Sequence, residues 1–290
     1  MTYELITTAL ELPFRPAEGN KGTFGRVLIL AGSVGMSGAA ALSGMAALRG
    51  GAGLVTVAVP APVQPIVAGF EPSYMTLALP ATDGGQFSRA AIENLEKLVP
   101  QASAIACGPG WGQSNELVDV LRWLMQTAKQ ALVIDADALN LLSQDLELLD
   151  QTSGPRILTP HPGEFARLIK SDVPAVQRQR IDLAVEFAAK HRVVVLLKGA
   201  GTVVTDGTRV AVNRTGNSGM GTGGTGDVLT GLLTALLAQG MEPFAAARLG
   251  AHWHGLAGDL AAAELSEPAL IASDLPRYFG PAWKELRRLP

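Results

Sequence analysis

The sequence NSGMGTGGTGDVLTG, which runs from Asn217 to Gly231, decides how the rest of the chain is interpreted. Five of the eleven residues from Asn217 to Asp227 are glycine, and the apolar run from Val228 to Gln239 is typical of a helix. A glycine-rich loop that leads into a helix brings free backbone N–H groups and the positive end of the helix dipole to one point. The sequence therefore predicts a phosphate-binding site at this helix start.

Asp227 follows the last glycine of this loop directly. An aspartate at a helix start is usually an N-cap, which contributes about 1 kcal/mol. Five glycines oppose folding by about 2.5–5 kcal/mol relative to alanine, more than one cap offsets. Because a carboxylate would repel a phosphate unless it handles a proton or a metal, we interpret Asp227 as a general base beside a phosphate cradle. The predicted cradle consists of Gly223, Gly224, Thr225 and Gly226.

The composition indicates a cytoplasmic globular protein. Of the 290 residues, 48% are hydrophobic, which is ample for a buried core. The net charge of −3 gives no electrostatic footprint for nucleic acid. The only cysteine, Cys107, lies in an apolar run, so we expect an inert core residue, no disulfide within the chain and a reducing compartment. We expect neither a signal peptide nor a membrane partner, because no suitable apolar run is present.

Short β-branched runs alternate with longer amphipathic or alanine-rich runs, a pattern typical of a parallel sheet covered by helices on both faces. The predicted strands are Val27–Ala31, Leu54–Val59, Ala104–Cys107, Leu132–Ile134, Ile157–Thr159, Val193–Leu197, Thr202–Thr205 and Val210–Asn213. The predicted helices are Gly38–Arg49, Ser88–Leu98, Glu116–Thr127, Ala175–Lys190, Val228–Gln239 and much of Pro243–Glu264. The Asp206-Gly207 pair predicts a hairpin between the last two strands. With no repeat or linker visible, we predict a single domain over residues 1–290.

Small and polar residues follow many of these strands. The segments concerned are GSVGMSGAA (Gly32–Ala40), GPGWG (Gly108–Gly112), DADAL (Asp135–Leu139), PHPGE (Pro160–Glu164) and KGAGT (Lys198–Thr202). In open α/β sheets, ligands bind outside the carboxyl ends of the strands. Together with the glycine-rich loop, these segments predict a long cleft at one edge of the sheet.

Individual residues of this edge allow more than one interpretation. Asp137 fits a cap for a helix that begins at Ala138, whereas Asp135, at a strand end, is the better ligand candidate. His161 lies between two prolines and has no helical face to pack against, so a ligand contact and a structural role are equally compatible with its place. Lys198 is either a surface lysine or a phosphate partner.

The motifs that are missing narrow the chemistry. There is no GxxxxGK[ST] and no set of protein-kinase signatures, and the two GxGxxG matches within the loop are expected by chance in so many glycines. His252 and His254 do not share a helix face, so we predict packing rather than a metal pair. The interpretation that remains is that the protein transfers a phosphoryl group to an alcohol. Asp227 as base would contribute typically ~10²–10⁴-fold, the cradle would stabilise phosphoryl charge, and Mg²⁺ would bridge the nucleotide phosphates.

GTGD at a helix start resembles the ribokinase-like superfamily of small-molecule kinases. The match extends to KGTFG (Lys21–Gly25), the five strand-end segments, LTPHPGE (Leu158–Glu164) and HGLAGDLA (His254–Ala261). In this order they are similar to the ADP-dependent NAD(P)H-hydrate dehydratase family, over residues 21–261. The resemblance implies a ribokinase-like three-layer α/β/α sandwich with a mainly parallel central sheet. LTPHPGE and GMGTGGTGDVLTG are far more specific than GTGD alone.

The resemblance also implies a reaction and a set of contacts. The S epimer of NADHX or NADPHX, the hydrates of NADH and NADPH, would be phosphorylated on its ring hydroxyl by ADP (ATP in eukaryotic relatives). Elimination of phosphate would then restore NAD(P)H and leave AMP. By motif, the hydrate would contact Ala39, Gly110, His161 and Asp227. The adenine nucleotide would contact Lys198, Gly199, Ala200, Gly201, Thr202 and Gly226.

Some features depart from the family or stay open. Ser218 stands where the family often has proline, and Gly221 where it often has alanine. Because only about twenty residues precede Lys21, we expect the epimerase that is often fused to this family to be a separate protein. The resemblance suggests a homotetramer. The alternatives are a kinase of a thiazole or pyrimidine alcohol, a nucleotide sensor without turnover, and an NAD(P) oxidoreductase, while preferences between ADP and ATP and between NADHX and NADPHX stay open.

Overall fold

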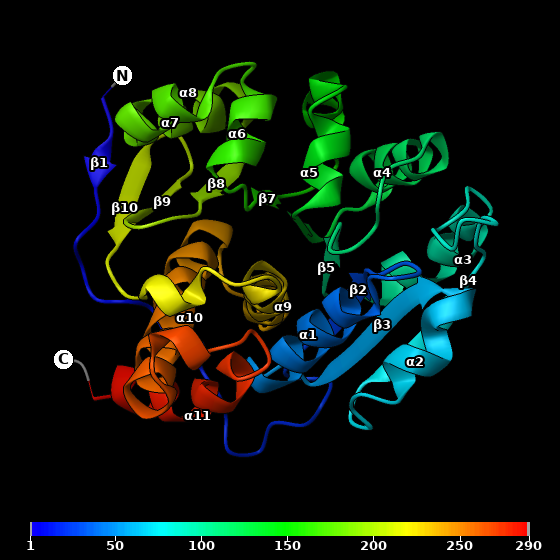
Figure 1. The fold of residues 1–290 in the computed structure, drawn as a ribbon, viewed down its shortest axis with the longest axis horizontal. Helices are drawn as coiled ribbons and strands as arrows, with labels where there is room; N and C mark the ends of the chain where they lie inside the picture. Colours follow the sequence, from blue (N-terminus) through cyan, green and yellow to red (C-terminus); the bar gives the residue numbers. More distant parts are fainter. Residues whose placement is uncertain (1, 289–290) are drawn as a thin grey trace.

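The computed structural model describes residues 2–288, which form one ten-stranded sheet with helices on both faces (Figure 1). The strand order is β1-β10-β9-β8-β7-β6-β5-β2-β3-β4, and the strands from β2 to β8 all run parallel. Successive residues of β2 enter different cores: Val27 and Ile29 pack into one, and Leu28 and Leu30 into the other. A sheet with two apolar faces needs a helical layer on each side. The predicted three-layer arrangement with a mainly parallel sheet is confirmed.

The elements have the following bounds. The strands are β1 (Glu4–Leu5), β2 (Arg26–Leu30), β3 (Leu54–Pro60), β4 (Met75–Leu79), β5 (Ala104–Cys107), β6 (Ala131–Ile134), β7 (Arg156–Leu158), β8 (Val194–Leu197), β9 (Thr202–Thr205) and β10 (Arg209–Asn213). The helices are α1 (Ser37–Arg49), α2 (Gln64–Ala68), α3 (Ala91–Leu98), α4 (Asn115–Thr127), α5 (Asp137–Leu142), α6 (Pro162–Leu168), α7 (Val173–Arg178), α8 (Arg180–His191), α9 (Thr225–Ala238), α10 (Pro243–Leu265) and α11 (Leu275–Leu286). No helix within residues 2–288 combines the length and the apolar character that a membrane span requires.

All eight predicted strands are present, and the predicted hairpin is confirmed by the antiparallel pairing of β9 with β10. The single predicted helix from Ala175 to Lys190 is wrong, because the chain leaves helical geometry at Gln179, with φ of −130°, and continues as α8. The predicted start of another helix at Ser88 is also wrong, since α3 begins three residues later at Ala91. The single-domain assignment stays a prediction.

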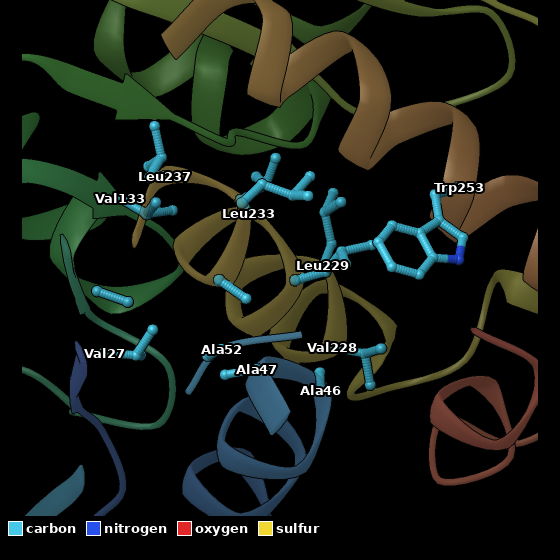
Figure 2. Close-up of a cluster of buried hydrophobic side chains, with 14 of the residues drawn as sticks. Val27, Ala46, Ala47, Ala52, Val133, Val228, Leu229, Leu233, Leu237 and Trp253 are labelled. Atoms are coloured by element: carbon cyan, nitrogen blue, oxygen red, sulfur yellow. The ribbon is translucent and has the colours of Figure 1, made fainter. Parts of the chain in front are cut away.

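Helix α9 lies at the centre of one helical layer and carries the glycine-rich loop at its N-terminus. Every residue from Val228 to Ala238 is buried, because α1, α10 and the sheet enclose this helix (Figure 2). Figure 2 shows Leu229 and Leu233 between the sheet and Trp253 of α10, with Ala46 of α1 on the other side. A helix that is apolar all round is stable only in such a setting. The packing therefore holds the loop at the start of α9 on a rigid support.

Gly231 sets how closely α1 and α9 approach. A methyl group added at this position would lie 2.0 Å from the carbonyl oxygen of Ser43, so Gly231→Ala must push the two helices apart. We expect a loss of about 1–3 kcal/mol in the free energy of unfolding, measured by urea denaturation. Gly280→Ala is the control, since an added methyl there meets no atom within 4 Å, and it should leave stability unchanged or slightly higher. Equal stability of both variants would contradict this packing.

Candidate active site

The segments that follow β2, β5, β6, β7 and β8 lie along one edge of the sheet, because these strands are parallel neighbours. Two contacts tie them together. The Ser33 hydroxyl after β2 donates to the Gly110 carbonyl after β5, at 2.8 Å. The Lys198 ammonium after β8 lies 2.8 Å from a carboxylate oxygen of Asp135 after β6. The predicted clustering of these segments is confirmed.

The loop before α9 offers a row of free backbone donors. Within residues 2–288, the backbone N–H groups of residues 222 to 227 donate no hydrogen bond to a protein acceptor. Gly224 is the N-cap of α9 and has φ of +94°, which favours glycine, and a methyl group added there would lie 2.6 Å from Leu42. These six consecutive amides at the positive end of a 14-residue helix can hold an anion.

Asp227 is not the cap of α9. It is the third residue of the helix, and its backbone carbonyl accepts a hydrogen bond from the Ser43 hydroxyl at 3.0 Å. Burial, together with the negative charge of Asp135, raises the pKa of the Asp227 carboxyl to about 7. A carboxyl with this pKa is half ionised near neutral pH, which is the range in which a general base is most effective.

Lys198 is held as a cation beside the start of α9. Its ammonium contacts Asp135 at 2.8 Å and Glu164 at 3.8 Å, and a methyl group added at Gly226 would lie 3.3 Å from the same nitrogen. Burial disfavours the charged form of Lys198, but the two carboxylates together have the larger effect, so the pKa of Lys198 is raised. Asp135 is only 1% exposed and also accepts the Thr230 hydroxyl at 2.8 Å. Burial alone would raise the pKa of Asp135; Lys198 and the hydrogen bonds lower it. Lys198 is therefore not a freely solvated surface lysine.

His161 has a structural role, which was one of the two interpretations that its sequence position allowed. It is the N-cap of α6, where its Nδ1 accepts the N–H groups of Gly163 at 3.0 Å and Glu164 at 3.3 Å. The Glu164 carboxylate accepts the His161 N–H at 2.7 Å, which completes a capping box. Burial lowers the pKa of His161, and a neutral ring that accepts at Nδ1 carries its proton on Nε2. Half of this side chain is exposed, so Nε2 can still donate to a ligand.

The interpretation of Asp137 as a helix cap is wrong. Helix α5 begins at Asp137 itself, and its carboxylate accepts the N–H of Gly112 at 2.8 Å, which joins the segments after β5 and β6. The preceding residue, Ala136, has φ of +51° and occupies the N-cap position instead. On the same edge, a methyl group added at Gly110 would lie 3.0 Å from Ala39, so the two residues are neighbours.

A cavity of about 550 Å³ opens between the β8–β9 loop, the glycine-rich loop and α10. Of the predicted nucleotide contacts, its walls include Lys198, Gly199, Ala200, Gly201, Thr202, Thr225 and Gly226. Gly223 and Gly224 lie outside this lining, as do the four predicted hydrate contacts, Ala39, Gly110, His161 and Asp227. The lining holds two permanent cations, Lys198 and Arg214, and no carboxylate, so the cavity is suited to an anionic ligand. A second cavity, of about 740 Å³ at the N-terminal segment, contains no predicted site residue.

The core and Cys107 behave as expected from the sequence. Cys107 is fully buried in β5, and burial raises the pKa of its thiol, so it is an inert core residue. His254 is also buried, as predicted, and its Nε2 lies 3.0 Å from the carbonyl oxygen of Thr225. Burial lowers the pKa of His254 to about 4, so this ring is neutral and donates to the first turn of α9.

A family model described as NAD(P)H-hydrate dehydratase matches residues 27–278. The chain belongs to this family. It is 37% identical to the ADP-dependent (S)-NAD(P)H-hydrate dehydratase of Neisseria meningitidis serogroup B, over 94% of this chain and 89% of the relative. It is 45% identical to the bifunctional NAD(P)H-hydrate repair enzyme of Moorella thermoacetica over 91% of this chain. The chain spans about half the length of such bifunctional relatives, 50% in that case.

Solved structures of similar proteins confirm the fold. The ADP/ATP-dependent NAD(P)H-hydrate dehydratase of Bacillus subtilis, co-crystallized with ATP and Mg²⁺, is 32% identical and superimposes with a TM-score of 0.81 over 95% of this chain and 94% of that one. A ribokinase-like superfamily protein of Enterococcus faecalis, 28% identical, has the same TM-score over 94% of this chain and 91% of its own. The ribokinase-like architecture that the resemblance implied is therefore correct.

Proposed function

We propose that this chain catalyses the ADP-dependent dehydration of the S epimer of NADHX and NADPHX to NADH and NADPH, with release of AMP and phosphate. The observation that carries the proposal is the pairing, at the start of α9, of free amide donors with a carboxyl group whose pKa is raised to about 7. The names of the Neisseria and Bacillus proteins support the substrate class and the nucleotide.

The first step of the proposed reaction is phosphoryl transfer. The hydroxyl oxygen of the hydrate attacks the terminal phosphorus of ADP, the bond from that phosphorus to the AMP oxygen breaks, and Asp227 takes the hydroxyl proton. The amides of Gly223, Gly224 and Gly226 would neutralise charge on the transferred group, because they have no other acceptor in the protein. Lys198, held charged beside Gly226, would do the same.

The second step is elimination. The bond between the ring carbon and the phosphate oxygen breaks, phosphate leaves with the electron pair, and the neighbouring ring carbon gives up a proton to solvent to form the double bond. An electron-rich ring nitrogen assists the departure of phosphate. We propose that Ala39, Gly110 and His161 hold the hydrate for both steps, with Nε2 of the half-exposed His161 ring, which lies 3.5 Å from Glu164, as a hydrogen-bond donor.

The adenine nucleotide is assigned to the cavity of about 550 Å³. Lys198, Gly199, Ala200, Gly201, Thr202 and Gly226 would contact it. Mg²⁺ usually arrives on phosphates and takes few ligands from the protein. The residues fit that mode, because the carboxylates nearest the cradle, Asp135 and Glu164, are already bound by Lys198, Thr230 and the His161 N–H, so Mg²⁺ would take most of its ligands from phosphate and water. Bound Mg²⁺ would neutralise phosphate charge.

The pH dependence of turnover tests the role of Asp227 as a base. Because its pKa is raised, Asp227 is protonated and inactive below about pH 7 and ionised above it. We expect kcat/KM to rise as the pH increases through this value and then to level off. The measurement is the pH profile of kcat/KM for the hydrate with saturating nucleotide. A profile that is flat or that falls across this interval would contradict the assignment.

A product assay tests the proposed function itself. Incubation with chemically prepared NADHX, Mg²⁺ and ADP should restore the absorbance of the dihydronicotinamide with one AMP and one phosphate per turnover. The rival is a kinase of a thiazole or pyrimidine alcohol, which would instead give a stable phosphate ester. Detection of such an ester, and no conversion of NADHX, would refute the proposal.

The proposal extends to partners. We propose a homotetramer in the cytoplasm and an epimerase on a separate chain that supplies the S epimer. Sedimentation analysis tests the assembly. With a mixture of R and S hydrates, this chain alone should convert only the S form, and complete conversion without an added epimerase would contradict the separate partner.

A further inference from the structure

The glycine-rich loop is attached to one face of α10 through Asp259, a residue to which no role has been assigned. One carboxylate oxygen of Asp259 accepts the backbone N–H of Gly216 at 2.9 Å, and the other accepts the side-chain amide of Asn217 at 3.0 Å. None of the ion pairs within residues 2–288 involves Asp259, and both of its oxygens accept from the loop.

The side chain of Asn217 connects Asp259 to the next turn of the loop. Its side-chain carbonyl accepts the N–H of Gly219 at 3.0 Å, as the N-cap of the short helix Ser218–Met220. Because a carboxylate can only accept, Asp259 compels Asn217 to present its NH₂ group to α10 and its oxygen to Gly219. Three donors are thus satisfied by three acceptors in a single chain of hydrogen bonds.

Other residues on this face of α10 also pack closely against the loop. A methyl group added at Gly255 would lie 2.6 Å from the backbone of Thr215, and one added at Gly258 would lie 2.2 Å from the sulfur of Met220. His254, one residue before Gly255, donates to the carbonyl of Thr225 at 3.0 Å. The loop therefore lies against α10 from its beginning to the start of α9.

The segment that Asp259 holds forms a wall of the nucleotide cavity. Gly216, Asn217, Ser218 and Met220 all line the cavity of about 550 Å³, whereas Asp259 itself does not. A glycine-rich wall that had to become ordered when nucleotide binds would weaken binding by the entropy of ordering. We infer that Asp259 is a positioning residue, which preorders the Gly216–Gly219 wall for the adenine nucleotide. This inference rests on the proposed function for the identity of the ligand.

Asp259→Asn is the sharpest test, because it keeps the shape of the side chain and removes one acceptor. Whichever way the side-chain amides at positions 217 and 259 are oriented, one of the contacts then places two N–H donors opposite each other. We expect amide hydrogen exchange in the segment 216–221 to become faster, and KM and Kd for ADP to rise by about tenfold with kcat within about threefold, as for the loss of one satisfied hydrogen bond. Glu264→Gln, an exposed change on the same helix, should alter neither.

The double substitution Asn217→Asp with Asp259→Asn restores the match of donors and acceptors at the same net charge. It should return the exchange of residues 216–221 to the wild-type rate, whereas a merely destabilised helix would not recover. Should Asp259→Asn fail to fold, Asn217→Ala tests the same bridge from the loop side. Unchanged exchange and an unchanged Kd for ADP in a folded single variant, or no recovery in the double variant, would overturn the inference. Failure of the wild-type chain to bind ADP or ATP would instead contradict the proposed function, because the exchange arm needs no ligand.

Discussion

Asp227→Asn is expected to lower kcat by roughly 10²–10⁴-fold, the usual contribution of a positioned base. The substitution keeps the shape of the side chain and its place in the first turn of α9, but removes its ability to take the hydroxyl proton. Nucleotide binding should persist or become tighter, since one negative charge beside the phosphates is lost. Single-turnover conversion of NADHX and isothermal titration with ADP measure the two effects separately.

The matched control for this prediction is Asp182→Asn. Asp182 is the third residue of α8, the position that Asp227 has in α9, but it is exposed, whereas Asp227 is partly buried. It should leave kcat unchanged. Full turnover by Asp227→Asn would show that another group takes the proton, and our mechanism would then be wrong.

Lys198→Met is expected to have the second-largest effect, on stability as well as on binding. The carboxylate of Asp135 is 1% exposed and has Lys198 as its ion-pair partner at 2.8 Å. Removing one partner of a buried pair costs about 3–5 kcal/mol, because the remaining charge is left uncompensated. We expect a loss at the lower end of this range, since the Lys198 side chain is 21% exposed, together with a loss of ADP affinity of about tenfold or more.

Two further variants separate the two roles of Lys198. Combining Lys198→Met with Asp135→Asn removes the more buried of the two carboxylate charges that lose their cation, so unfolding stability should partly recover while ADP affinity stays low. Lys198→Arg keeps the charge and should retain most of the stability. If Lys198→Met unfolds at the wild-type urea concentration, the pair with Asp135 does not contribute to stability as we argue.

The central part of the fold was predictable because buried parallel strands are short, apolar and separated by helices. Each of the eight predicted strands lies within two residues of its observed position. Strand β4 was missed because it is an edge strand whose first residue, Met75, is 48% exposed, so it lacks the continuous apolar run of its neighbours. The interruption of the helix at Gln179, between α7 and α8, could not be predicted, because neither glycine nor proline marks this position in the sequence.

The residues of the candidate site could be proposed from the sequence, but the burial and charges around them could not. The glycine spacing identified the amide row, and parallel topology placed Lys198 and Asp135 at the same edge. The sequence HPGE contains the signal for the capping box of His161, namely proline at the first helical position and glutamate at the third. By contrast, the raised pKa of Asp227 depends on its burial and on its distance from Asp135, which no local pattern encodes.

The most direct test of the account is the crystal structure of Asp227→Asn bound to ADP, Mg²⁺ and the S hydrate. We predict that oxygens of the terminal phosphoryl group accept hydrogen bonds from the amides of Gly224 and Gly226, and that the hydrate hydroxyl contacts the side chain at position 227. A terminal phosphoryl group bound away from the start of α9, or a hydroxyl out of hydrogen-bond reach of that side chain, would contradict the central claim.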